Sequence, residues 1–159
     1  MTNECERLAL ELDRALNGGA WHGPSWRESL DGVDRATAAA RPIPGGHTIG
    51  EIVLHATLWL DVVRRRIAGE TPQVPDELDW RAAAFADDAA WAAAVEESLA
   101  AGRALVAIVR AFPPERLLDP RPGIEAPWYE LFSGELQHIL YHAGQVSLLR
   151  KTGVPAEAR

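Results

Sequence analysis

Residues 48–67 read TIGEIVLHATLWLDVVRRRI, and this stretch decides the fold class of the chain. Thr48 and Glu51 form the T-x-x-E pattern of a capping box, in which each side chain binds a backbone N–H left unpaired at the start of a helix. Apolar side chains then recur at the spacing of one helix face; they are Ile49, Ile52, Val53, Ala56, Trp59, Leu60, Val63 and Ile67. Gly69 supplies a stop signal. The stretch therefore predicts one long amphipathic helix.

The rest of the chain shows the same pattern of helical stretches separated by proline and glycine. Three further long helices are predicted, over residues 3–16, from residue 87 or 88 to just before Pro113, and over residues 128–151 with a stop at Gly153. A short helix is predicted from about Ser25, residues 70–86 and 113–127 are predicted to be loops, and no stretch alternates as a strand does. Four long helices without strands predict an all-α four-helix bundle that forms one domain over residues 1–159.

The loop predicted at residues 113–127 is long for a connection between bundle helices, which usually takes about 2–8 residues. It holds five of the eleven prolines. A long ordered loop often carries function, but some loops are simply long. Both interpretations stay open: the segment lines a site, or it only joins two helices.

Composition argues against several functions. The formal net charge of -7 disfavours nucleic acid as a partner, because phosphate binding needs a concentrated basic surface. The run Arg64-Arg65-Arg66 is expected to be a solvated helix face, with an anion or partner site as the alternative. Cys5 is the single cysteine, lies near a terminus expected to be mobile, and is not expected to be catalytic. Without an apolar run of about 18 residues or a signal-peptide pattern, a cytoplasmic protein with no membrane partner is expected.

The most informative chemistry lies in residues 135–142, ELQHILYH. His138 and His142 are four residues apart, which places them about 40° apart on a helix, one turn above the other. Two imidazoles so placed can bind one metal ion, although for the pair alone one packed and one exposed histidine is the favoured explanation. Ile139 stands where the H-E-x-x-H pattern of zinc peptidases has glutamate, so a peptidase of that type is not expected. Glu135 and Gln145 fall on the same helix stripe.

A third ligand has to come from elsewhere in the chain. His55 lies on the helix predicted at residues 48–67 and faces partly toward the core, so it is either a buried structural histidine or a ligand contributed by a neighbouring bundle helix. His47 precedes the cap of that helix and is interpreted as a turn residue. His22 lies in a Trp-His-Gly turn and is a weaker candidate for a pocket.

Three stretches resemble one family. Residues 45–55, GGHTIGEIVLH, followed by Trp59, are similar to the second-helix signature of the DinB/YfiT-like family. Residues 138–150, HILYHAGQVSLLR, resemble its fourth-helix signature, H-x-x-Y-H-x-G-Q, and the Trp21-His22-Gly23-Pro24 turn resembles one branch of it. The resemblance implies an up-down-down-up four-helix bundle, often a homodimer. It also implies one divalent metal ion, nickel or zinc, on the positions that match its ligands: His55, His138 and His142.

The resemblance also implies a reaction class. Characterised relatives include transferases that use low-molecular-weight thiols, so we expect a metal-dependent thiol transferase acting on a small-molecule substrate. The alternatives are a non-catalytic metal-binding protein related to stress, and a metal-dependent hydrolase, which would need a carboxylate base beside the metal. The candidates for supporting the ligands or lining the pocket are Glu51, Glu135, Gln145, Tyr141, Trp21 and His22.

Overall fold

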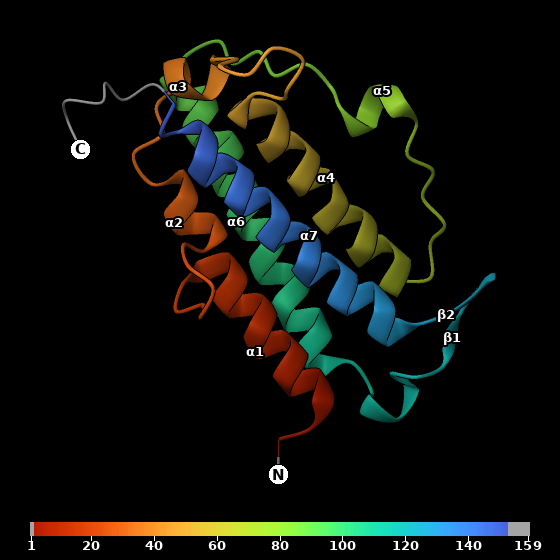
Figure 1. Ribbon diagram of the computed structural model, residues 1–159. Coiled ribbons are helices and arrows are strands. Elements are labelled where there is room, and N and C mark those ends of the chain that lie inside the picture. The colour runs from red at the N-terminus through yellow and green to blue at the C-terminus, as the bar shows by residue number, and fades with distance from the viewer. Residues whose placement is uncertain (1, 153–159) are drawn as a thin grey trace.

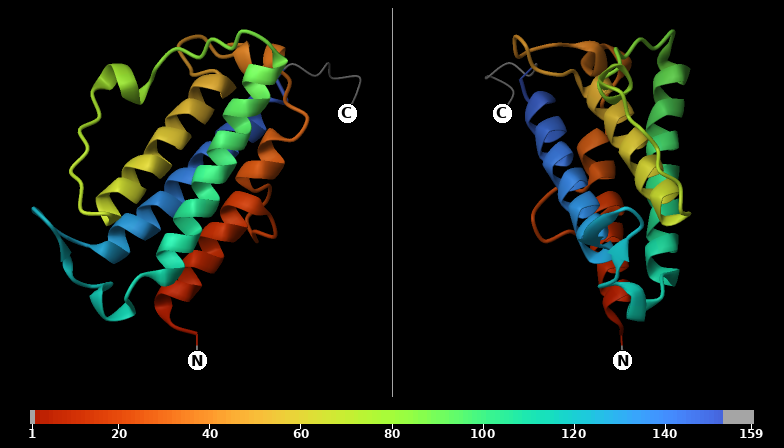
Figure 2. Two further views of the ribbon diagram at one scale, coloured as in Figure 1. Left: turned by 180° about the vertical axis from the view of Figure 1, so that it is seen from behind. Right: turned by 90° about the vertical axis from the view of Figure 1, so that its right-hand side faces the viewer.

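Four long helices form the body of the computed structural model, which describes residues 2–152. They are α1 (Glu4–Asn17), α4 (Ile49–Ile67), α6 (Asp88–Ala111) and α7 (Trp128–Leu149). Helix α6 packs against both α1 and α4, and α7 packs against the same two helices from the other side (Figures 1 and 2). In Figure 1, α1 and α7 run from the lower end of the molecule to the upper end, whereas α4 and α6 run the opposite way.

The helix starts follow the capping signals in the sequence. Thr48 and Glu51 form the predicted capping box of α4: the Thr48 N–H donates to Glu51 Oε2 at 2.9 Å, and the Glu51 N–H donates to Thr48 Oγ1 at 3.1 Å. Asn3 and Glu6 cap α1 in the same way, and Asp87 caps α6. The long helices predicted from the sequence are thus confirmed within two residues at each described end, while Gly153 lies outside the described residues.

The connections contain more structure than the sequence predicted. The expected short helix is α2 (Trp26–Leu30), but α3 (Arg35–Ala39) and α5 (Asp76–Asp79) were not predicted. Residues 113–127 hold a 3-10 turn, η1 (Pro114–Arg116), and a hairpin of β1 (Pro120–Arg121) and β2 (Ile124–Pro127), so the expectation of no strand was wrong. Elements of two to five residues are too short to show a helical or alternating period, which explains why they were missed.

Buried side chains from all four long helices form one core. Gly102 lets α6 approach α1 closely, since a Cβ there would lie 2.8 Å from Leu16 Cδ2. Cys5, expected near a mobile terminus, has a side chain that is fully buried in α1, and burial raises the pKa of its thiol. Among residues 2–152, none of the helices combines the length and hydrophobicity required to cross a bilayer.

Candidate metal centre

Three histidines meet where α4 and α7 pack side by side. His55 comes from α4, and His138 and His142 come from successive turns of α7. His138 Nε2 lies 3.0 Å from His55 Nε2 and 2.9 Å from His142 Nε2. The ligand atoms of all three residues lie within 4.8 Å of one another, close enough to hold one metal ion.

Each imidazole turns its other ring nitrogen toward an oxygen. His55 Nδ1 lies 3.0 Å from both the backbone oxygen and Oδ1 of Asp79. His142 Nδ1 lies 2.6 Å from Gln145 Oε1. His138 Nδ1 lies 3.6 Å from Glu135 Oε1, longer than a hydrogen bond, and neither of these buried atoms has another partner. Oxygens accept hydrogen bonds, so the contacts of His55 and His142 place the proton on Nδ1 of these two rings and leave their Nε2 lone pairs free.

The donor set fits a divalent cation. The Nε2 atom of His138 lies within 3.0 Å of the other two Nε2 atoms, and a proton shared there would satisfy only one pair of the three. A cation at the point of convergence accepts all three, and neutral imidazole backed by an oxygen on Nδ1 is the usual form of a histidine ligand. Burial, with a smaller contribution from His138, lowers the pKa of His142 to about 4, and burial lowers the pKa of His55. Both histidines are therefore held neutral, as binding of a metal such as zinc, nickel, copper or iron requires.

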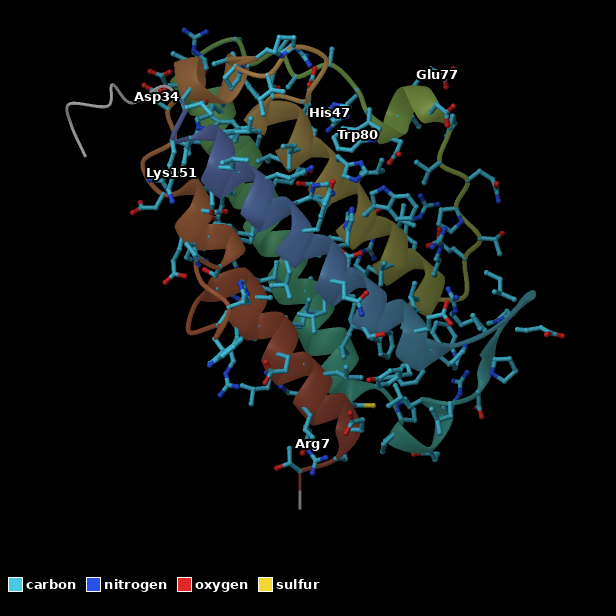
Figure 3. The ribbon with its side chains drawn as sticks, in the orientation of Figure 1. Arg7, Asp34, His47, Glu77, Trp80 and Lys151 are labelled. Atoms are coloured by element: carbon cyan, nitrogen blue, oxygen red, sulfur yellow. The ribbon has the colours of Figure 1, made fainter. Side chains whose placement is uncertain are left out.

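The segment formed by α5 (Asp76–Asp79) and Trp80 packs against the histidine cluster. Trp80 stacks on His55, with ring centroids 3.9 Å apart, and on His47, at 3.6 Å. Figure 3 shows His47 and Trp80 beside each other, next to α5. The Trp59 indole N–H donates to Asp79 Oδ1 at 2.6 Å, which fixes the carboxylate that holds His55. Asp79 and Trp80 were not predicted from the sequence, since they lie in a segment predicted to be a loop.

The other sequence candidates divide into two groups. Gln145 and Glu135 lie against His142 and His138, as described above. Glu51 caps α4 and pairs with Arg41 at 2.6 Å, so its carboxylate does not contact His55. Tyr141 is 64% exposed, although its ring centroid lies 5.1 Å from that of His142. The structure brings neither Trp21, which is fully exposed, nor the exposed His22 to the cavity beside the histidines.

A cavity of about 430 Å³ opens beside His55 and His138. Trp59, Arg66, Arg121 and Glu135 contribute to its walls, so the hairpin segment reaches the site through Arg121. Burial raises the pKa of the Glu135 carboxyl, which favours its protonated form. A small molecule in this cavity would contact the histidines at one end and arginines at the other.

Comparison with known proteins identifies one family. The family model of the DinB superfamily matches residues 21–145, which is most of the chain and includes all three histidines of the cluster. No curated protein and no solved structure matches the chain significantly.

Proposed function

The chain belongs to the DinB superfamily, and we propose that it binds one divalent metal ion, nickel or zinc, and transfers a low-molecular-weight thiol to a small electrophile. His55, His138 and His142 are the proposed ligands. The observation that carries the proposal is the convergence of their three Nε2 atoms while each Nδ1 faces an oxygen.

Three protein ligands leave coordination positions open, which distinguishes catalytic from structural metal sites. A divalent cation supplies the acidity that turns a thiol into a nucleophilic thiolate near neutral pH. The chain itself holds His55 and His142 neutral, lines the cavity where the electrophile would lie, and covers one face of the His55 ring with Trp80. Transfer would form a carbon–sulfur bond as the leaving group departs with its electron pair. Cys5 is buried in the core, so the thiol in this proposal comes from a separate molecule.

Metal-assisted hydrolysis is a second candidate function, because Glu135 satisfies its requirement for a carboxyl group beside the cluster. Glu135 lines the same cavity and lies 3.6 Å from His138. The pKa of its carboxyl group is raised, which is the direction in which enzymes shift carboxyl groups that act in general acid–base catalysis. Glu51, the other carboxylate considered, is occupied by the cap of α4 and by Arg41.

Thiol consumption against a panel of thiols and electrophiles tests the proposal. Metal-loaded protein should consume thiol, whereas chelated protein and His138→Ala should not. His22→Ala is the matched control, because this exposed histidine lies outside the cluster and should keep full activity. Equal rates with and without metal reject the mechanism. Ester hydrolysis without thiol consumption supports the hydrolase, and inactivity at full metal occupancy supports a non-catalytic metal-binding protein.

We further propose the up-down-down-up bundle topology and homodimer that family membership suggests. The helix directions in Figure 1 support the topology. A single cysteine is compatible with a reducing compartment, and on this basis we propose a cytoplasmic location. Sedimentation equilibrium tests the dimer directly.

A further inference from the structure

The three consecutive arginines at the end of α4 have different surroundings. Arg64 pairs with Asp61 at 2.6 Å, and Arg65 pairs with Glu70 at 2.7 Å. The side chain of Arg66, by contrast, has no hydrogen bond or ion pair to any residue in the described part of the chain. Its guanidinium group lies 5.5 Å from the centre of the Trp59 ring, half-buried in the wall of the cavity.

A second arginine reaches the same place from the hairpin, which lies beside the lower end of α4 in Figure 1. Arg121 donates its Nε–H to the backbone oxygen of Ala126 at 3.1 Å, and this bond orients the side chain. Within residues 2–152, its terminal nitrogens have no partner. Arg66 and Arg121 line both the 430 Å³ cavity at the histidines and an adjoining cavity of about 260 Å³.

The carboxylates of this region leave the two arginines without an ion-pair partner in residues 2–152. Glu130 and Glu135 line the cavity, but neither forms an ion pair with Arg66 or Arg121 in the described residues. Glu135 is buried beside His138, and Glu130 is exposed. Burial, and secondly the neighbouring Arg121, lower the pKa of Arg66, and the opposing contribution of Glu135 is smaller. Two half-buried cations that form no ion pair with a carboxylate repel each other, and an anion between them would reduce that cost.

We propose that Arg66 and Arg121 bind an oxyanionic group, a carboxylate or phosphate, of the small molecule that reacts at the histidine cluster. A guanidinium group presents paired N–H donors that match both oxygens of such a group. Trp59 lies between the arginines and the histidine cluster. Arg66 lies over its ring, and its ring centroid lies 6.2 Å from that of His138. The substrate class is therefore an anionic small molecule whose acid group lies at a distance from its reactive atom. The reactive end of this assignment rests on the proposed function, whereas the anion site does not.

Matched thiols test the anion site on the zinc-loaded protein by calorimetric titration. The probes are 6-mercaptohexanoate and 6-mercaptohexanol, which differ in the terminal group. The carboxylate should bind about 10- to 100-fold more tightly, the range expected for a charge-assisted hydrogen-bonded pair. Arg66→Gln and Arg121→Gln should each reduce this preference strongly. Arg64→Gln is the control, since Arg64 pairs with Asp61 at the surface, and it should leave the preference unchanged.

Equal binding of the two thiols to the wild-type protein would overturn the proposal, as would a preference that survives in both arginine variants. Hexanoate and inorganic phosphate, which lack a thiol, separate this result from the proposed function. Arg66-dependent binding of these two anions would support the anion site. If neither thiol then binds in a metal-dependent manner, the anion site is retained and the thiol-transfer proposal is rejected. Tighter binding of hexanoate identifies the substrate as carboxylated, and tighter binding of inorganic phosphate identifies it as phosphorylated. Circular dichroism melting confirms that each variant is folded.

Discussion

His55 and Trp80 stack face to face, with their ring centroids 3.9 Å apart and their planes 5° from parallel. The residue before Trp80 in the chain is Asp79, which holds Nδ1 of the same imidazole. Trp80 also stacks on His47, just before the start of α4. The segment at α5 therefore fixes both the rotation and the tautomer of His55. The candidate metal centre depends on this connection as well as on the two helices that carry its histidines.

We expect one divalent ion per chain in protein purified without a histidine tag. The double variant His138→Ala with His142→Ala should lose it, because His55 alone cannot hold a metal against solvent. Elemental analysis by mass spectrometry measures the occupancy, and His22→Ala should keep one ion per chain. Full occupancy in the double variant would show that the ligands are elsewhere.

Asp79→Ala should weaken metal binding by about 10-fold, the lower end of the range for residues that support a metal ligand. The effect should be at the lower end because the backbone oxygen of Asp79 also accepts from His55 and survives the substitution. Competition with a chromogenic chelator measures the affinity. Asp76→Ala is the matched control, since Asp76 lies exposed on the same short helix and makes no contact with the histidines. Equal losses in both variants would mean that the helix, not the carboxylate, supports the site.

The metal-free protein should become less stable as the pH falls below about 6.5. Burial and, secondarily, His138 lower the pKa of His142 from 6.5 to about 4 in the folded chain. Between these values the unfolded chain binds the extra proton and the folded chain does not, so stability rises with pH through this window. The contribution is fully present above the upper value and is lost as the pH falls toward the lower one.

Urea midpoints of chelated protein, measured at several pH values between about 7.5 and 4.5, check this dependence. Since carboxylates also titrate at the acid end, His142→Gln provides the comparison and should give a shallower pH profile. His22→Ala, which alters an exposed histidine, should follow the wild-type profile. A profile for His142→Gln as steep as the wild-type one would refute the assignment.

Gly50→Ala should destabilise the protein by about 1–3 kcal/mol, the usual cost of overpacking. A Cβ at Gly50 would lie 2.9 Å from both Ala83 Cβ and Phe85 Cε2, so the segment after Trp80 would have to move. Metal affinity should fall as well, because this segment continues from the stack on His55. Gly144→Ala is the control: a Cβ there meets no heavy atom within 4 Å, and the gain in helix propensity should stabilise α7 by up to about 1 kcal/mol. Denaturant unfolding measures the change in stability of each of the two variants.

The site could be predicted from the sequence only in part. The His138–His142 pair follows from the 3.6-residue period of a helix, since both residues lie on one element. The assignment of His55 required the family resemblance, because 83 residues separate it from His138. Among the supporting residues, Gln145 and Glu135 were found because they share a helix face with the pair. Glu51 was also a candidate, but its carboxylate serves in the capping box of α4.

The sequence by itself determined the all-helical class, the extent of the long helices and the capping box at Thr48, because these depend on backbone and side-chain contacts within a few residues. Only the tertiary structure decided which atoms surround the histidines. Asp79 and Trp80 reach His55 across a loop, and Arg121 reaches the cavity from a hairpin with no periodic signal. Likewise, three adjacent arginines look equivalent in the sequence, yet Arg66 alone among them lines the cavity. Contacts of this kind depend on how α4 packs against α7 and how the connections fold over them, and no local pattern encodes that packing.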